Sequence, residues 1–387
     1  MNLSEIQAAL RDGGHEAWLF YDHHHRDPIA YRVLGLPPDR LTTRRWFYLI
    51  PANGEPKKLV HRIESHHLDT LPGSKTEYSS WEELWSGLEA MVKPYRRLVM
   101  QYSANNQIPY ISLVDAGMLD LVRSFDKQID TSANLVARFE ATLTEAQIAS
   151  HYKAQEKIDA ITAGAFQEIG RRARNGGTYE YEIQQWIMQA FEREGLVTCD
   201  PPNVSVNAHS GDPHYEPSSA NSAPIKVGDF VLLDIWAKTN EPDSVFYDIT
   251  WTGVIGTPSD KQREVFNIVR DARDVGINKV KAAFAAGKPI CGWEVDQAVH
   301  EFLAGKGYEK AIFHRTGHSI TSDIHGNGAN LDNLETKDDR LILPNTCFSV
   351  EPGLYFPDFG VRSEIDMMIR NGKPEVTGRI QSELVLI

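Results

Sequence analysis

The sequence predicts an α/β (α+β) protein of two domains. The chain has 387 residues, which exceeds the usual size of one domain. Helical and strand patterns alternate over roughly the first 140 residues, and a long helical stretch then opens a strand-rich second region. We place the boundary near residue 138, which gives an amino-terminal domain at 1–138 and a carboxy-terminal domain at 139–387.

The amino-terminal domain begins with an amphipathic pattern. Within residues 3–12, Ile6, Ala9 and Leu10 share one face of a helix, and Gly13 ends the pattern. Segments rich in aromatic and aliphatic residues predict strands, at 17–21, 45–50 and 96–102. Helices and strands that alternate in this way indicate a mixed α/β domain.

The carboxy-terminal domain opens with two predicted helices, at 144–174 and about 179–195, which Asn175-Gly-Gly177 separates. Two strands follow at 228–238 and 245–256, and the turn-prone residues TNEPDS between them predict a hairpin. Two further helices and then loops and strands complete the domain, the helices at about 261–285 and 293–304.

The composition excludes several classes of function. The formal net charge is −13, which disfavours non-specific binding to nucleic acid or an anionic membrane. The first residues carry Glu5 and no apolar core, so they do not resemble a secretory signal. No stretch approaches the roughly 20 apolar residues that span a bilayer, and the three cysteines do not form a disulfide framework. We therefore expect a cytoplasmic protein.

Two carboxylates interrupt the apolar strands of the predicted hairpin. Asp234 follows three aliphatic residues, and Asp248 lies between Tyr247 and Ile249. Burial of such carboxylates is unfavourable unless they are paired or bind a metal. Opposite residues in an antiparallel hairpin lie about 5 Å apart, close enough to share cations. Taken alone, the pattern is equally compatible with aspartates at strand ends that face solvent.

Three later segments add polar residues to this pair. HRTGHSITSDIH offers His314, His318 and His325, and imidazole is the commonest metal ligand. Glu351 follows an apolar strand directly, and Glu364 lies within another. Four carboxylates balance the charge of two divalent ions, and a site of oxygen ligands with one imidazole suits Mn²⁺, Co²⁺ or Zn²⁺.

The ordered segments LLDIW, YDITWTG, HRTGHSI, VEPGLY and GVRSE carry a family resemblance. The order Asp, Asp, His, Glu, Glu resembles that of the "pita-bread" metallopeptidases of family M24, which include methionine aminopeptidase, aminopeptidase P and prolidase, with creatinase as a metal-free relative. The resemblance covers roughly residues 140–387. It implies a pita-bread (creatinase/aminopeptidase) catalytic domain, preceded by a creatinase/prolidase-like domain as in the prolidase and aminopeptidase P branch.

The resemblance also implies roles for these residues. Asp234 would bind one ion, Asp248 and Glu364 would bridge both, and His318 and Glu351 would hold the other. Two divalent ions, with Mn²⁺ expected and Co²⁺ or Zn²⁺ as alternatives, would activate a bridging hydroxide.

Catalysis and substrate binding would involve further side chains. Glu351 would act as proton shuttle, and His214 and His325 would stabilise the oxyanion and orient the peptide. His314 and Arg362 would contact the substrate, with Arg362 near a peptide carboxylate.

We therefore expect an Xaa-Pro dipeptidase (prolidase) that acts as a homodimer on proline-containing peptides. The first alternative is an Xaa-Pro aminopeptidase that removes one residue from longer peptides. The two differ in whether a cation in the pocket requires a free carboxylate. The second alternative is a non-catalytic pita-bread protein that binds peptides, although no metal ligand is lost. In relatives the amino-terminal domain of one subunit can approach the partner's site, so His23-His24-His25 is a candidate gating loop and not a metal site.

Overall fold

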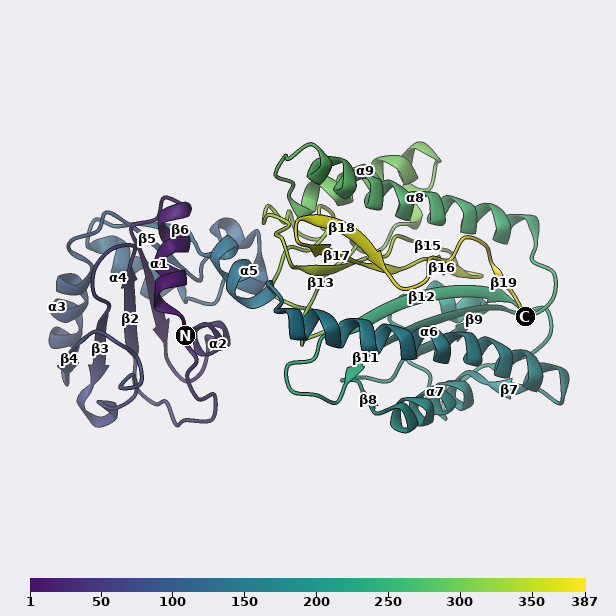
Figure 1. Cartoon of the computed structure of the whole chain (residues 1–387), viewed down its shortest axis with the longest axis horizontal. Coiled ribbons are helices and arrows are strands. Elements are labelled where there is room, and N and C mark those ends of the chain that lie inside the picture. Colours follow the sequence, from purple (N-terminus) through teal and green to yellow (C-terminus); the bar gives the residue numbers. More distant parts are fainter. The chain divides into compact units, whose positions relative to one another are not determined.

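A computed structural model describes residues 1–387. The chain folds as two compact units, Met1–Glu140 and Ala141–Ile387. Each contains both helices and sheets, so the α/β (α+β) prediction is confirmed (Figure 1). None of the helices combines the length and apolar character that a bilayer-spanning segment requires.

The first unit is built on one six-stranded mixed sheet with the order β4-β3-β2-β1-β5-β6. The central strand β1 pairs antiparallel with β2 and parallel with β5. The strands are β1 (Ala17–Asp22), β2 (Trp46–Pro51), β3 (Lys57–His61), β4 (Ser74–Tyr78), β5 (Arg97–Met100) and β6 (Gln128–Thr131).

Apolar side chains cover both faces of this sheet. Trp18 and Phe20 of β1 belong to one core, and Leu19 and Tyr21 belong to another, because neighbouring strand residues point to opposite faces. The covering helices are α1 (Leu3–Asp12), α2 (Pro28–Leu34), α3 (Trp81–Val92), α4 (Ala116–Ser124) and α5 (Ala133–Ala141). Short 3₁₀ turns lie at η1 (Arg62–Glu64), η2 (Ala104–Asn106) and η3 (Pro109–Ile111).

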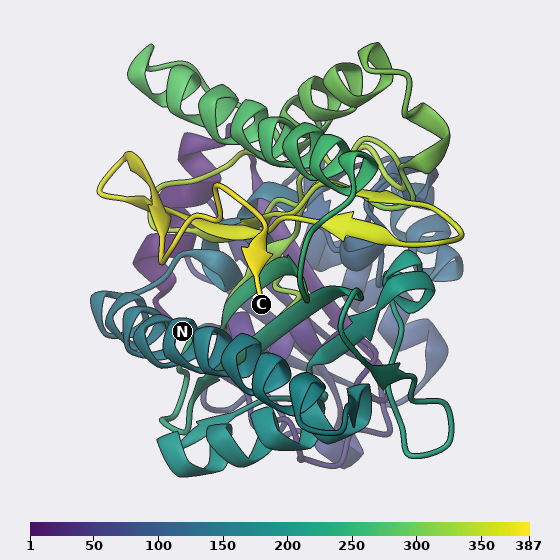
Figure 2. The same cartoon turned by 90° about the vertical axis from the view of Figure 1, so that its right-hand side faces the viewer.

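The second unit places helices outside its sheets (Figure 2). One pair, α6 (Glu145–Arg174) and α7 (Glu180–Glu194), lies on one side, and α8 (Asp260–Ala285) and α9 (Gly292–Gly305) lie on the other. Capping boxes fix where α6 and α8 begin, through Thr144 with Gln147 and Ser259 with Gln262. The four helices agree with the sequence prediction to within about one or two residues.

Two principal sheets lie between these helix pairs. One has the order β19-β12-β11-β8, with β9 also on β11, and the other has the order β13-β14-β17-β18. The strands of the first are β8 (Leu196–Val197), β9 (Asn203–Val206), β11 (Phe230–Thr239), β12 (Tyr247–Val254) and β19 (Val385–Leu386). Those of the second are β13 (Ser319–Ile320), β14 (Cys347–Val350), β17 (Ile365–Arg370) and β18 (Lys373–Thr377).

Smaller elements complete this unit. Two two-stranded sheets join β7 (Thr178–Tyr179) to β10 (Pro224–Ile225) and β15 (Gly353–Tyr355) to β16 (Gly360–Arg362). Two 3₁₀ turns, η4 (Asn207–Gly211) and η5 (Glu309–Ala311), lie in the connections.

The predicted hairpin is formed by β11 and β12, which pair antiparallel. Asp234 is opposite Thr250, and Asp248 is opposite Trp236. The two aspartates therefore share one face of the sheet but lie diagonally, not directly opposite each other. Asp248 is only 5% exposed, which excludes the alternative that it faces solvent at a strand end.

Candidate metal centre

The acidic cluster is assembled where the two principal sheets meet. Asp234 and Asp248 come from β11 and β12, Glu351 follows β14 directly, and Glu364 precedes β17 directly. Strands β14 and β17 pair antiparallel, and their last pair is Val350 with Ile365. Glu351 and Glu364 lie just beyond this pair, so they are held near each other. His318 precedes β13, whose residue Ser319 pairs with Phe348 of β14.

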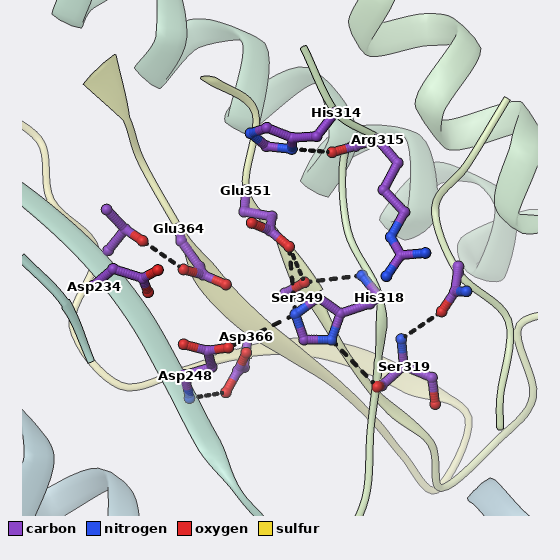
Figure 3. A network of polar contacts seen from close by, with 12 residues as sticks. Asp234, Asp248, His314, Arg315, His318, Ser319, Ser349, Glu351, Glu364 and Asp366 are labelled. Carbon is purple, nitrogen blue, oxygen red and sulfur yellow. Dashed lines mark hydrogen bonds and ion pairs between the residues drawn. The ribbon is translucent and has the colours of Figure 1, made fainter. Parts of the chain in front are cut away.

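The structure brings all five predicted ligands into one site (Figure 3). One possible ligand atom from each of Asp248, His318 and Glu364 lies within 4.8 Å of the other two. The Nε2 atom of His318 is 3.4 Å from Oε1 of Glu351 and 3.7 Å from Oδ2 of Asp248.

Arg362 reaches the same cluster from β16. Its guanidinium donates hydrogen bonds to the carboxylate of Asp234, to Thr250 Oγ1 at 3.0 Å and to the Tyr355 hydroxyl at 3.1 Å. Its Nε atom is also 3.8 Å from Oε2 of Glu351. Arg362 is only 4% exposed, so its charge is placed among the carboxylates and away from water.

Further polar residues orient the carboxylates. The Thr250 hydroxyl donates to Oε2 of Glu364 at 2.6 Å, and the Ser349 hydroxyl donates to Oε1 of Glu351 at 3.1 Å. The backbone N–H of Asp248 donates to Oδ2 of Asp366 at 2.9 Å. One carboxylate oxygen of Asp248 is buried and has no hydrogen-bond partner.

Burial shifts the protonation of the cluster. It raises the pKa of Glu351 to about 7 and the pKa of Asp248 and of Glu364 well above their usual values, and the neighbouring carboxylates add to each rise. Burial also lowers the pKa of His318 well below its usual value, which leaves a neutral imidazole that can bind a cation.

The other predicted histidines surround the cluster. His325 lies against His318, with ring centroids 4.5 Å apart. His314 donates from Nδ1 to the Arg315 carbonyl at 2.6 Å, and its Nε2 is 2.7 Å from the Tyr355 hydroxyl, while burial lowers its pKa to about 3. The exposed His214 lies near both, since its charge lowers the pKa of His314 and of His325.

Sequence reasoning missed several residues of this site. Four polar residues contact a predicted ligand or one of its partners, namely Thr250, Ser349, Tyr355 and Asp366. In the sequence, the only signal for each was that a polar residue lies inside an apolar strand. Arg315 was missed as well. Its side chain extends beside His318 in Figure 3, and its charge lowers the pKa of Glu351, His318 and His325.

This donor set fits divalent cations. Four carboxylates and a neutral imidazole converge, and the unpartnered oxygen of Asp248 is a further acceptor that a cation would satisfy. Without cations, burial favours the protonated forms of Asp248, Glu351 and Glu364, since it raises the pKa of each. A buried acidic cluster with one imidazole, held between two sheets and two helix pairs, is typical of a metal-dependent hydrolase.

The chain belongs to metallopeptidase family M24, whose model matches residues 153–371, more than half of the chain. The resemblance noted in the sequence is thereby confirmed. The Xaa-Pro dipeptidase of Pyrococcus furiosus is 30% identical over 262 residues, which cover 66% of this chain and 67% of that protein. A putative Xaa-Pro aminopeptidase of Mycoplasma pneumoniae is 29% identical over 231 residues, or 59% of this chain, and the match spans 60% of that relative's length.

Solved structures share the whole fold. Dipeptidase PepE from Mycobacterium ulcerans has a TM-score of 0.71 at 20% identity, with 100% of this chain and 96% of that chain covered. The Xaa-Pro dipeptidase from Bacillus anthracis has a TM-score of 0.62 at 22% identity, with 100% and 99% covered. These likenesses confirm the predicted pita-bread fold with an amino-terminal domain.

Proposed function

We propose that the protein hydrolyses Xaa-Pro dipeptides with two divalent metal ions bound at Asp234, Asp248, His318, Glu351 and Glu364. The observation that supports this most directly is the convergence of four carboxylates and a neutral imidazole in one buried site. Bound ions would polarise the peptide carbonyl and make hydroxide available near neutral pH. Mn²⁺ is the expected ion, with Co²⁺ or Zn²⁺ as alternatives.

In this proposal Glu351 moves the proton. Its carboxylate is held at Oε1 by the Ser349 hydroxyl and lies 3.4 Å from His318. The Glu351 carboxylate would accept a proton from water and return it to the leaving amine.

The histidines contact the peptide. His325 and His214 lie beside the cluster and would donate to the carbonyl oxygen as negative charge develops on it. Burial keeps the His314 ring neutral, and its hydrogen bonds place the proton on Nδ1. The scissile Xaa-Pro amide has no N–H, so the site needs no acceptor at that position.

Arg315 is the cation that we assign to the free carboxylate of a dipeptide. The donors of Arg362 are already directed to Asp234, Thr250 and Tyr355, so its role in this proposal is to hold the Asp234 carboxylate. The half-buried Arg315 lies beside His318, and its charge lowers the pKa of His325, which in this proposal contacts the peptide. A guanidinium suits a planar carboxylate.

Activity on longer peptides is the second candidate, since a putative Xaa-Pro aminopeptidase is among the relatives. The decisive assay measures hydrolysis of Ala-Pro, Ala-Pro-amide and Ala-Pro-Ala by chelator-stripped protein with Mn²⁺, Co²⁺ and Zn²⁺ added separately. Metal-dependent cleavage of Ala-Pro alone supports the dipeptidase. Equal or faster cleavage of Ala-Pro-Ala supports the aminopeptidase, and silence with every ion supports a peptide-binding protein. The expected homodimer and cytoplasmic location stay predictions.

A further inference from the structure

The second unit contains another group of possible metal ligands, apart from the five residues of the acidic cluster. It consists of His151 from α6, Cys347 from β14 and Asp366 from β17, and all three side chains are buried. One possible ligand atom from each residue lies within 4.8 Å of the other two. The group therefore brings a nitrogen, a sulfur and an oxygen from three distant parts of the chain to one place.

The imidazole of His151 is held in the tautomer that can bind a cation. Its Nδ1 atom is 2.6 Å from the Phe246 carbonyl, which can only accept, so Nδ1 carries the proton. Burial lowers the pKa of His151 to about 4, so the ring is neutral and Nε2 has a lone pair. A hydrogen bond from the other ring nitrogen to a backbone carbonyl is the usual support of a metal-binding histidine.

The present partner of Nε2 has another acceptor within reach. Nε2 of His151 is 2.9 Å from the Thr377 hydroxyl, and this hydroxyl also lies 3.4 Å from the backbone carbonyl of Asp366. A hydroxyl has one proton and donates to one acceptor at a time. A cation at Nε2 would therefore leave the Thr377 hydroxyl bonded to the Asp366 carbonyl.

Asp366 and Cys347 supply the other two donor atoms. Oδ2 of Asp366 accepts a hydrogen bond from the backbone N–H of Asp248 at 2.9 Å (Figure 3), whereas Oδ1 is buried and has no partner. A buried oxygen without a partner is unfavourable, and a cation would satisfy it. The buried thiol of Cys347 forms no disulfide. A thiolate and a carboxylate together carry two negative charges, which one divalent cation balances.

We propose that His151, Cys347 and Asp366 bind one thiophilic divalent cation, and that Zn²⁺ fits this donor set best. Imidazole, thiolate and carboxylate are all zinc ligands, whereas a thiolate does not suit Mn²⁺. Ligand atoms around a tetrahedral zinc ion lie about 3.5 Å apart, so the atoms of each pair approach by at most about 1.3 Å. The thiol proton is released to solvent as the ion binds.

The bound ion would join α6 to both β14 and β17, and this site does not depend on the proposed peptidase activity. The absorption of the full chain with Co²⁺ tests the thiolate ligand. Co²⁺ added to chelator-stripped protein should produce the near-ultraviolet charge-transfer band of a cobalt–thiolate bond. The double variant Cys199→Ser/Cys291→Ser leaves Cys347 as the single thiol and should keep this band. Cys347→Ser should lose it. Absence of the band from the double variant overturns the proposal, whether or not Cys347→Ser folds.

Two histidine variants locate the ion, with circular dichroism as the check on folding. His151→Gln should lose the band and one zinc ion per chain after dialysis, whereas His318→Ala, in the acidic cluster, should keep the band. The loss of one zinc ion is counted against the native chain, so it is independent of how many ions the acidic cluster holds. A band that persists in His151→Gln, or that disappears in His318→Ala, would place the ion elsewhere and overturn the proposal.

Discussion

The guanidinium of Arg362 is hydrogen-bonded to the carboxylate of Asp234, inside the acidic cluster of the second unit. A positive charge that belongs to the protein thus lies beside the carboxylates that could hold added cations. The cluster is therefore partly neutralised before any ion binds. Four carboxylates and one guanidinium leave a net charge that two divalent ions and one hydroxide would balance.

The first prediction concerns this arginine. Arg362→Met should destabilise the metal-free protein by about 3–5 kcal/mol, because removal of one partner leaves buried charge unpaired. The loss should be smaller with Mn²⁺ bound, since the ions then neutralise the carboxylates. Urea unfolding with and without Mn²⁺ measures both values. Lys153→Ala, which removes the exposed partner of Glu241, is the control, and equal losses in both conditions would contradict the idea.

The second prediction concerns the ions themselves. Each ion present at 100 times its Kd should raise the free energy of unfolding by about 2.7 kcal/mol, and chelation should remove this gain. Asp248→Asn should abolish most of the gain, because it removes a buried carboxylate of the site. Asp243→Asn, an exposed change in the adjacent turn, should leave it intact. Thermal unfolding with each ion measures the effect, and an equal response of the two variants would count against a metal at Asp248.

The third prediction separates two neighbouring histidines. His318→Ala should lower both metal content and activity, since Nε2 of His318 faces Glu351 and Asp248. His325→Ala should keep the metal and lower kcat by about 100-fold or more, the usual loss for a group that stabilises the transition state. Metal analysis of dialysed protein and steady-state kinetics give both values. Loss of metal in the His325 variant would show that it is a ligand.

The fourth prediction concerns substrate choice. Arg315→Ala should raise KM for Ala-Pro by about 10- to 100-fold, because a charge-assisted hydrogen bond is worth about 1.5–3 kcal/mol. Hydrolysis of Ala-Pro-amide, which lacks the carboxylate, should change little. Arg263→Ala, an exposed change on α8, is the control. An equal effect on both substrates would show that Arg315 supports the site and does not read the carboxylate.

The fifth prediction is a pH dependence in the first unit. Burial raises the pKa of Asp27 to about 7, although its carboxylate accepts hydrogen bonds from Ala30 at 2.9 Å and Gln101 at 2.7 Å. The folded state then holds a proton that the unfolded chain releases near pH 4. Asp27 therefore contributes its whole stabilising free energy below about pH 4, and this contribution is lost as the pH rises through 7.

Hydrogen exchange of β1 and α2, corrected for intrinsic rates, measures this loss. The local free energy of opening should fall by a few kcal/mol between pH 4 and pH 7, because one pKa unit is worth about 1.4 kcal/mol. Asp27→Asn should remove the slope, and Asp39→Asn, on the exposed surface, should not. A slope that survives Asp27→Asn would assign the proton to another group.

The residues of the acidic cluster could be found in the sequence for a physical reason. Asp234, Asp248 and Glu364 interrupt or adjoin apolar strands, and Glu351 and His318 flank others. A buried polar residue at such a place is unfavourable unless it has a partner. The two aspartates alone left solvent exposure open, and the two glutamates and the histidine added the indication of a shared partner. The element types were predictable for the same reason, because apolar periodicity reflects which face is buried.

The contacts that orient the cluster could not be found in this way. Asp366 accepts from a backbone N–H 118 positions away, and every residue offers such a group, so the sequence does not indicate which one is used. The diagonal placement of Asp234 and Asp248 depends on the path of the turn, which sets the register. Tyr355 joins His314 and Arg362 only because β15 and β16 fold back on each other.

Strand β12 leaves little freedom for insertion or deletion. Eight residue pairs join it to β11, and its side chains are used on both faces. A slip of one position would turn Ile249 and Trp251 toward the acidic cluster and Asp248 and Thr250 toward helix α6. Substitutions can therefore accumulate residue by residue along β12, while a change in its length would exchange the two faces at once.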